Sequence, residues 1–468
     1  MMATAAAGTF DRSWKAPTGS RWQRQVQTLL YAFVLALPFT AASVWNFSQW
    51  GFGIQPSYAA ATLLIGLVSW KALAGEAMIG LDSAARLLGC YTLLTVLSIG
   101  QSAFMPPDYV HLASKSPGVF SATQSVYIVI NFAVFVVARM MFRDALVLTR
   151  AIRIHFAAGA FCATWGIYQL VCHFTGIPYW PVFNNNIGWS QQYFQTILGA
   201  QRISSTAPEP SMLALYLLTV VPIVFNLTIN NVFLFARHVQ WAVLAITFSV
   251  LIMTTAFSAF LGVAVMLTLI SMLARRRELL IGGVIAGLLV WGSGEVFTAF
   301  SKTSVGLTEI TAGRVLDARS ARDTSFSIRF STLVTSAEIF LHNPIVGVGE
   351  GNYAFYHYFF SSEVIQPTPR TFSMTGRILA EHGLLGVILF GAFLARLLRL
   401  PGRLGRCGRD FVACYHAVWV AVVSALVVLL VSMAEMTYLH FWFLCGVLSA
   451  MQNSAQTSVG VSSGRTSH

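Results

Sequence analysis

The stretch FVACYHAVWVAVVSALVVLLVSM, residues 411–433, decides the fold class of this sequence. It contains no Asp, Glu, Lys or Arg, and it is long enough for an α-helix to cross a bilayer, which takes about 20 apolar residues. Similar runs recur along the chain, and together they predict an all-α integral membrane protein with about 12 transmembrane helices. The other predicted spans are 27–46, 56–75, 84–104, 119–141, 152–173, 209–229, 239–255, 257–274, 279–299, 376–396 and 438–452.

Composition excludes a soluble bundle. Of 468 residues, 56% are hydrophobic and only 10% are charged, whereas soluble domains carry about 25% charged residues. The net charge of +12 would otherwise suggest a nucleic-acid partner. Most Lys and Arg residues lie in short loops between the apolar runs, a pattern typical of the cytoplasmic side of a multi-pass protein of the bacterial inner membrane. We therefore expect a lipid bilayer as partner and no nucleic acid.

This charge pattern also sets the expected organisation. Residues 1–26 and 453–468 are predicted cytoplasmic tails, and residues 27–452 form a polytopic membrane domain. Two segments are predicted on the outer side of the membrane, residues 174–208 and residues 300–375. The second is a long loop before the last three helices. Long ordered loops usually carry function, so we expect the site there.

A glycine-rich stretch lies in the second of these segments. Residues 342–359 read HNPIVGVGEGNYAFYHYF, with Gly347, Gly349 and Gly351 in a GxGxG pattern. A nucleotide-binding loop needs a strand before it, a helix after it and a nucleotide on the same side of the membrane. On an outside loop we instead expect glycines that adopt positive φ and let another chain segment approach closely.

The same region resembles the signature of the O-antigen ligase and polymerase superfamily. That signature has an Arg opening a helix, a Pro, a GxG turn and an E-x-G-[LI]-x-G start of the next membrane helix. RFSTLVTSAEIFLHNPIVGVGEGNY (329–353) and ILAEHGLLGVILF (378–390) supply Arg329, Pro344, Gly347, Gly349, Glu381, Gly383 and Gly386. A second match, QRISSTAPEPSMLALYLL (201–218), supplies Arg202, Ser204, Ser205, Pro208 and Pro210. The resemblance covers residues 195–450.

The resemblance implies a GT-C type fold and a glycan transfer at the periplasmic face of the inner membrane. The donor would be an oligosaccharide on undecaprenyl pyrophosphate. A ligase would transfer it to lipid A core, and a polymerase to a sugar hydroxyl of another lipid-linked repeat unit. Many ligases carry His-Asn about nine residues before the E-x-G glutamate, where this chain has Phe372 and Ser373. The missing His-Asn pair and the closeness of Glu209 to Arg202 both favour the polymerase over the ligase.

Other readings remain beside the polymerase. A ligase is the first alternative. A transporter of lipid-linked sugars is another, but it would favour broken or charged helices over a large outside loop. A polymerase of this kind would work beside a chain-length regulator or a flippase.

Three residues are predicted to be catalytic. Arg202 and Arg329 would bind the pyrophosphate leaving group, because the guanidinium fork donates bidentate hydrogen bonds to phosphate and keeps its charge. Glu209 would act as general base on the acceptor hydroxyl. Its alternative role is a helix-start charge stabilised by the helix dipole. No DxD pattern occurs near the outside segments, so we expect metal-independent transfer without a cofactor.

Five further residues are predicted to bind substrate. Arg377 lies just inside a predicted span and Glu435 near the outer end of another, where a charge is costly and often functional. His357 and His382 are alternative bases, and Tyr353 could stack on a sugar ring. The alternative interpretations are snorkelling for Arg377 and an interfacial aromatic belt for Tyr353.

Overall fold

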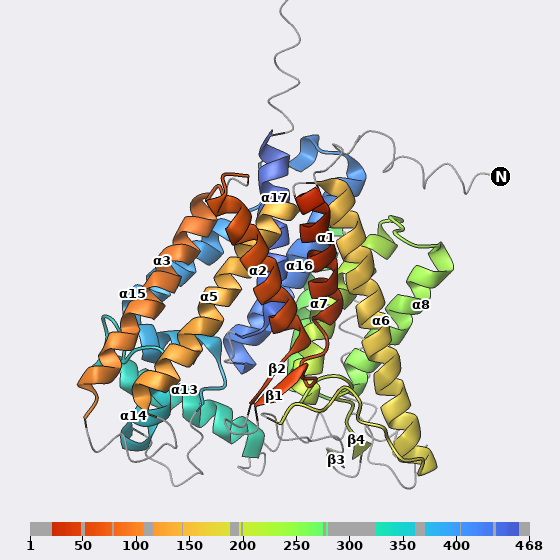
Figure 1. Ribbon diagram of the computed structural model, residues 1–468. Coiled ribbons are helices and arrows are strands. Elements are labelled where there is room, and N and C mark those ends of the chain that lie inside the picture. The colour runs from red at the N-terminus through yellow and green to blue at the C-terminus, as the bar shows by residue number, and fades with distance from the viewer. Residues whose placement is uncertain are drawn as a thin grey trace, which may run out of the picture.

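The computed structural model describes most of the chain. The described residues are 21–47, 52–76, 79–106, 116–142, 144–187, 196–197, 200–274, 278, 324–360, 370–402, 404–433 and 437–457. Figure 1 shows them as a bundle of helices with short strands at one end. The first half contains α1 (Arg21–Ala36), β1 (Trp45–Phe47), β2 (Phe52–Ile54), α2 (Pro56–Leu73), α3 (Ser83–Leu97), η3 (Ser98–Phe104), α5 (Pro117–Met141) and α6 (Ala145–Thr175). The second half contains β3 (Thr196–Ile197), β4 (Ala200–Gln201), α7 (Pro210–Ile229), α8 (Arg237–Met253), α9 (Phe257–Ala274), α13 (Thr324–His342), α14 (Tyr353–Phe360), α15 (Met374–Leu398), η4 (Leu404–Arg406), α16 (Arg409–Ser432) and α17 (Leu439–Thr457).

Length and hydropathy confirm an all-α membrane protein. Six helical segments are long and apolar enough to cross a bilayer: Ser83–Phe104, Pro117–Met141, Ala145–Thr175, Pro210–Ile229, Met374–Leu398 and Arg409–Ser432. Two shorter apolar helices are Arg237–Met253 and Ser258–Ala274. Within the described residues, every predicted span except 27–46 coincides with a helix over most of its length. The span 279–299 lies outside the described residues, and the total of 12 stays a prediction.

The first predicted span is shorter than expected. The sequence indicated 27–46, but α1 ends at Ala36 and Pro38 follows, where the missing N–H cannot continue a helix. Residues 45–47 instead pair with residues 52–54 as the antiparallel hairpin β1–β2. The predicted spans 239–255 and 257–274 correspond to two separate helices, α8 and α9, and Thr255 between them has φ 48°.

The helices begin and end where the local sequence supplies caps. Asp82 accepts a hydrogen bond from the N–H of Ala85 (2.8 Å) at the start of α3, and Asp144 does the same for Leu146 (2.8 Å) at the start of α6. Helix α6 stops at Gly176, whose φ of 72° closes the helix in the left-handed conformation.

Helix α7 forms the centre of the bundle. It is apolar on all sides and nearly all of its residues are buried, as expected of a helix enclosed by others. It packs against α16, α8 and α9, while α5 packs on α17 and α15 on α3. Because α7 is so well enclosed, the segment that leads into it has a fixed position.

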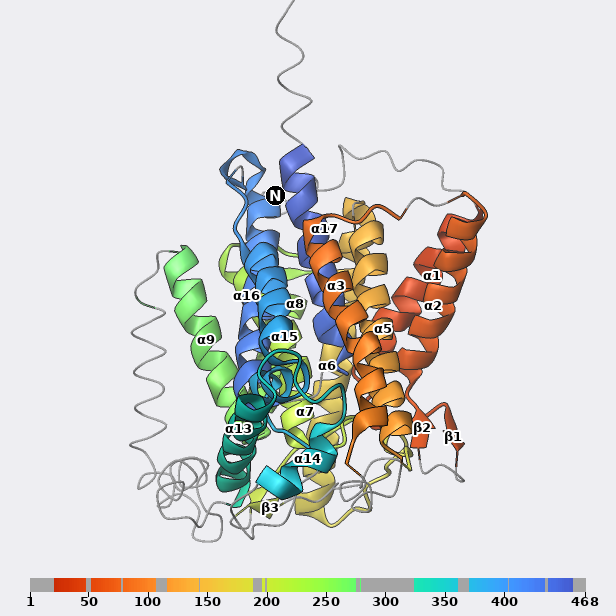
Figure 2. The ribbon, with the colours of Figure 1, turned by 90° about the vertical axis from the view of Figure 1, so that its left-hand side faces the viewer.

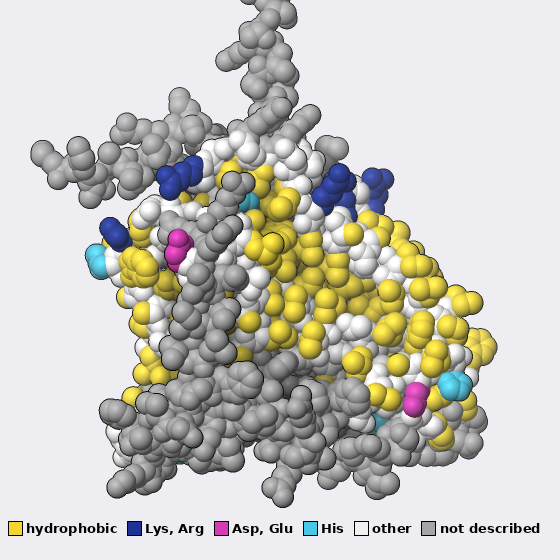
Figure 3. Space-filling view, turned by 180° about the vertical axis from the view of Figure 1, so that it is seen from behind, with side chains coloured by type: hydrophobic (Ala, Val, Ile, Leu, Met, Phe, Trp, Pro, Cys, Tyr) yellow, Lys and Arg dark blue, Asp and Glu magenta, His cyan; other side chains and the backbone are white. Residues whose placement is uncertain are grey.

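The two ends of the bundle differ. Figures 1 and 2 place α13, α14 and the two hairpins at one end, which we call the loop end. The connection between α15 and α16 lies at the opposite end. Figure 3 shows a band of hydrophobic side chains across the middle of one face, with Lys and Arg above it. This distribution suits a protein that crosses a membrane.

Candidate active site at the loop end

The segment between β4 and α7 is non-helical and buried. Residues 203–208 are all buried, although none of them belongs to a helix or a strand. Irregular backbone at this depth is tolerated only where other parts of the protein satisfy its polar groups. We call residues 202–209 the entry loop, because it leads into α7.

Helix α6 satisfies one side of the entry loop. The Gln169 side chain accepts hydrogen bonds from the N–H groups of Ser204 (3.1 Å) and Ser205 (2.9 Å). The Ser205 hydroxyl donates to the carbonyl of Cys162 (2.6 Å), which lies two turns from Gln169 on the same face of α6. Ser205 has φ 53°, a conformation that a residue other than glycine adopts only when its surroundings enforce it.

The end of α1 holds the other side. The Thr206 hydroxyl donates to the carbonyl of Pro38 (2.7 Å), and the N–H of Ala41 donates to the carbonyl of Thr206 (2.9 Å). The entry loop is therefore fixed between α6 and the segment that follows α1.

Arg202 and Glu209 lie at the two ends of this loop. Arg202 is half-buried and donates its Nε–H to the carbonyl of Thr254 (3.1 Å) and the hydroxyl of Thr255 (3.2 Å), at the turn between α8 and α9. Glu209 is the residue before α7, and its carboxylate accepts a hydrogen bond from the Ser211 hydroxyl (3.1 Å). A carboxylate here is also stabilised by the helix dipole. Two of the three predicted catalytic residues thus share one fixed segment.

The glycine-rich turn fills a break in α15. Gly383, inside α15, has non-helical angles (φ 58°, ψ −155°), so the neighbouring backbone groups lose their helical partners. The turn replaces them with four backbone hydrogen bonds, which run from Val348 to Ala380, Gly349 to Glu381, Leu384 to Pro344 and Leu385 to Ile345 (2.8–3.1 Å).

The predicted role of these glycines is confirmed. Gly347, Gly349 and Gly351 have φ values of 66°, 92° and 76°. A Cβ on Gly347 would lie 2.4 Å from the carbonyl carbon of Glu381, closer than any real contact. At Gly347 the GxGxG pattern therefore allows the backbone of the turn to approach the backbone of α15 closely.

A buried charge cluster joins the turn to α15. Arg377 donates to Glu381 (2.9 Å), to Glu350 and to Gln124 (3.2 Å). The Nε2 of His382 lies 2.9 Å from Glu350. The Arg377 side chain is 10% exposed, and that of Glu350 is fully buried. Arg377 therefore already pairs with two carboxylates, and its predicted contact with substrate stays a prediction that this pairing does not favour.

Electrostatics keep Glu350 ionised. Burial alone would raise the pKa of its carboxyl, but the charge of Arg377 and the hydrogen bond from His382 outweigh burial and hold the pKa below the ordinary value. The charged form of Glu350 is therefore the one that the cluster stabilises.

The cluster also contains groups able to bind a metal. One ligand atom each from Glu350, Glu381 and His382 lie within 4.8 Å of one another. Arg377 contacts both of these carboxylates, so a divalent cation would have to displace its guanidinium. The arrangement fits an ion-pair network better than a metal centre, and metal-independent transfer stays a prediction.

His357 and Tyr353 lie on α14 and are both buried. The Nδ1 of His357 lies 3.0 Å from the carbonyl of Ala354, so Nδ1 carries the proton and Nε2 holds the lone pair. Nε2 is buried without a hydrogen-bond partner among the described residues, and burial lowers the pKa of the imidazole. Tyr353 stacks on His357 with ring centroids 5.7 Å apart and donates its hydroxyl to Thr332 (3.4 Å). Its stacking on a sugar stays a prediction.

Two predicted site residues cannot be placed. Glu435 lies outside the described residues, and so does the side chain of Arg329, although the backbone of Arg329 belongs to α13. Helix α13 packs against α15 at the loop end. The backbone of Arg329 therefore lies at the loop end of the molecule, and its side chain lies outside the described residues.

The sequence analysis missed two residues that hold these segments. Glu350 lies between two of the glycines and was overlooked because the glycines explained the motif. Gln169 lies within the predicted span 152–173. A polar side chain in such a run is costly unless it has partners, and that cost was the available indication.

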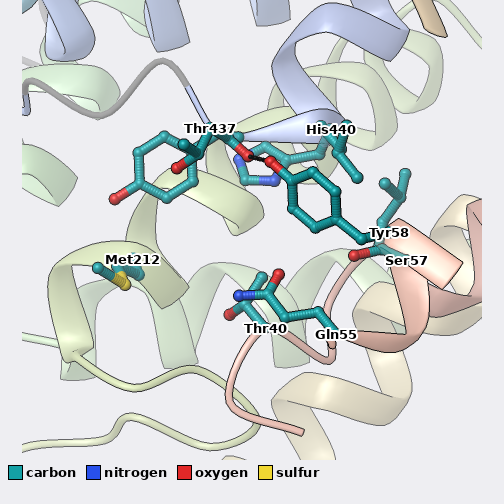
Figure 4. Close-up of a pocket in the computed structure, with 10 residues that line it drawn as sticks. Thr40, Gln55, Ser57, Tyr58, Met212, Thr437 and His440 are labelled. Carbon is teal, nitrogen blue, oxygen red and sulfur yellow. Dashed lines mark hydrogen bonds between the residues drawn. The ribbon is translucent and has the colours of Figure 1, made fainter. Parts of the chain in front are cut away.

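A small pocket opens beside the entry loop. It has a volume of about 20 Å³, enough for about one water molecule. Figure 4 shows Tyr58 donating its hydroxyl to the carbonyl of Thr437 (2.7 Å) beside His440, with Thr40 and Gln55 opposite. Met212 brings the first turn of α7 to the same pocket. Neither Arg202 nor Glu209 lines it.

Fold and site together define a multi-pass, all-α membrane protein with its buried non-helical segments gathered at one end. The family model described as O-antigen ligase matches residues 242–391, which begin within α8 and include α9, the glycine-rich turn and the break in α15. This match supports membership of the O-antigen ligase and polymerase family, whose members are glycosyltransferase-like enzymes. A comparison with curated proteins found no match.

Proposed function

We propose that the protein is a polysaccharide polymerase of the membrane. It would transfer a glycan from undecaprenyl pyrophosphate to a sugar hydroxyl of a second lipid-linked repeat unit. The observation that carries the proposal is the placement of Arg202 and Glu209 at the two ends of one buried, hydrogen-bonded loop. The family match supports the reaction class.

The proposed reaction needs a cation for the leaving group. The bond between the anomeric carbon and the phosphate oxygen breaks, and the pyrophosphate leaves with the electron pair. Arg202, joined by Arg329, would stabilise the charge that grows on the leaving oxygen. Fixed donors act most strongly where charge develops in the transition state.

The acceptor needs a base. The acceptor oxygen forms the new bond to the anomeric carbon and gives its proton to the carboxylate of Glu209. Glu209 suits this role because it is half-buried and its carboxylate accepts a hydrogen bond from a hydroxyl, that of Ser211. His357 is the second candidate, since its Nε2 holds a lone pair. His382 is less suited, because its Nε2 already contacts Glu350.

A ligase is the alternative function, and the family model that matches residues 242–391 is described by that name. Both reactions use the same donor and leaving group and differ in the acceptor. Against the ligase, Phe372 and Ser373 occupy the place of the His-Asn pair that many ligases carry.

The proposal also includes the membrane in which the protein lies and its orientation there. The loop end would face the periplasm from the inner membrane, because lipid-linked repeat units are presented there. A chain-length regulator or a flippase would be a partner of such a polymerase.

The acceptor can be tested directly. Purified protein in liposomes would receive the lipid-linked repeat unit as its only sugar substrate, with and without lipid A core, and products would be read by gel and mass spectrometry. A ladder of repeat-unit multiples without lipid A core, lost in Arg329→Ala, supports the polymerase. Transfer only when lipid A core is present would replace it with the ligase. No transfer to either acceptor would reject the donor class.

A further inference from the structure

A fully buried glutamine lies in the membrane-spanning part of α6. Gln169 has no exposed surface, and α6 is one of the six helices long and apolar enough to cross a bilayer. A buried amide without partners costs free energy, so a glutamine is expected here only if it forms hydrogen bonds.

Three hydrogen bonds join Gln169 to the entry loop. The Oε1 atom accepts from the N–H groups of Ser204 and Ser205 (3.1 and 2.9 Å), and the Nε2 atom donates to the Ser204 hydroxyl (3.3 Å). Without Gln169, two buried N–H groups next to the strained Ser205 would lose their acceptor.

The face of α6 around Gln169 is shaped for this loop. Gly166 lies one turn away, and a Cβ there would come within 2.6 Å of Ile203 and 3.4 Å of Ser205. Cys162 lies one turn further and accepts the Ser205 hydroxyl. Three residues at helical spacing thus form a cradle for the backbone that follows Arg202.

We propose that Gln169 is a positioning residue that sets the guanidinium of Arg202 and, through the same loop, the carboxylate of Glu209. It touches neither substrate nor reacting atoms in this account. Ser204 is only two residues after Arg202, so a shift of the loop at Ser204 moves the cation. The inference rests on the proposed function for its activity readout, but not for its structural readout.

The chain offers a matched control in Gln240. This glutamine on α8 is also fully buried, and two of its three hydrogen bonds hold a loop, residues 230–236, while the third reaches Thr228 at the end of α7. Its Oε1 accepts from the N–H of Leu234 (2.9 Å), and its Nε2 donates to Thr228 and to Val232 (both 3.0 Å). The loop it holds joins α7 to α8 at the other end of α7. Replacing either glutamine removes the same amide group, but each replacement affects a different loop.

The structural arm needs no substrate. Hydrogen–deuterium exchange would be followed in full-length Gln169→Met, Gln240→Met and wild type. We expect faster exchange at residues 203–207 in Gln169→Met only, and faster exchange near residues 232–234 in Gln240→Met only. Unchanged exchange at residues 203–207 in Gln169→Met would overturn the proposal whatever the enzyme does.

The kinetic arm tests whether the loop position matters for transfer. A misplacement of about 1 Å can cost about a hundredfold in rate, so we expect Gln169→Met to lower kcat about that much with little change in donor KM. Gln169→Glu keeps an acceptor for the two N–H groups and should recover much of the loss, while Gln240→Met should keep kcat near wild type. Equal kcat for both Met variants would contradict a positioning role.

A double-mutant cycle links Gln169 to Arg202. If Gln169 acts through Arg202, adding Gln169→Met to Arg202→Lys should cost far less than it costs the wild type. Adding Gln240→Met should cost the same in both backgrounds. Independent effects of Gln169→Met and Arg202→Lys would overturn the proposal, whereas an inactive wild type would count against the proposed function and leave the exchange result standing.

Discussion

Two non-helical segments meet the bundle at the loop end, and they are held in different ways. The entry loop, residues 202–209, depends on side chains of α6 and on the end of α1. The glycine-rich turn, residues 343–352, depends on backbone hydrogen bonds to the broken α15 and on a buried charge cluster. The arginine of the entry loop and the arginine of α15 that contacts the glycine-rich turn have different partners. Arg202 donates its Nε–H to two uncharged oxygens, whereas Arg377 pairs with two carboxylates.

This difference separates two roles that the sequence could not separate. An arginine between two buried carboxylates belongs to a network that is costly to break. An arginine at the end of a fixed loop presents its guanidinium, a strong phosphate-binding group, at a defined position. We therefore assign the glycine-rich turn to architecture and the entry loop to chemistry.

Breaking the charge cluster should have the largest effect on stability. Arg377→Met leaves Glu350 and Glu381 buried without their cation, and removing one member of a buried ion pair costs about 3–5 kcal/mol. Thermal unfolding in detergent would measure the loss. The control is Lys71→Met, which removes an exposed pair with Glu76 (3.0 Å) and should cost no more than about 1 kcal/mol. An Arg377→Met protein as stable as Lys71→Met would contradict the architectural role.

Removing the proposed base should lower activity without unfolding the protein. General-base catalysis contributes about 10²–10⁴-fold, so Glu209→Gln should lose transfer by that factor with little change in unfolding temperature. The control is Ser211→Ala, which removes the hydroxyl that donates to Glu209 and should cost less than tenfold in rate. Activity within threefold of wild type in Glu209→Gln would shift the assignment to His357.

A methyl group in the glycine-rich turn should weaken the fold moderately. Gly347→Ala forces a side chain into φ 66° and against the backbone of Glu381, and overpacking of this kind costs about 1–3 kcal/mol. Gly391, on the same helix α15, has open space at its Cβ position. Gly391→Ala should therefore be neutral or slightly stabilising. Equal unfolding temperatures for the two variants would show that the turn is not tightly docked.

The smallest predicted effect is a pH dependence at His357. Burial lowers the pKa of this imidazole in the folded state, so the unfolded chain takes up the proton first as pH falls below about 6.5. The contribution of His357 to stability is therefore complete above that pH and is lost below it. Wild type should lose more thermal stability than His357→Gln between pH 7.5 and 5.5. Parallel losses would indicate that the imidazole is not desolvated.

Much of the fold followed from apolar run lengths, because a bilayer imposes one length on each span. The runs located α5, α7 and α16 within a few residues. They could not show that α15 is broken at Gly383, since that break exists only because a distant turn supplies its hydrogen bonds. The early end of α1 was readable from Pro38, but the surrounding hydrophobicity concealed it.

The site was less predictable than the fold. Arg202 and Glu209 were predicted from the resemblance of residues 201–218 to the superfamily signature. The state of Arg377 depends on Glu350, which is 27 residues away in the chain and meets it only after the turn docks. The role of Gln169 likewise requires α6 and the entry loop to meet.

The central claim is that the entry loop, rather than the charge cluster, carries the cation for the leaving group. The most direct test is single-turnover transfer by Arg202→Ala, with the folded fraction measured on the same preparation. Loss of one transition-state donor costs about 10²–10³-fold, so we predict that decrease in a protein that unfolds near the wild-type temperature. Wild-type transfer by a folded Arg202→Ala protein would contradict the claim.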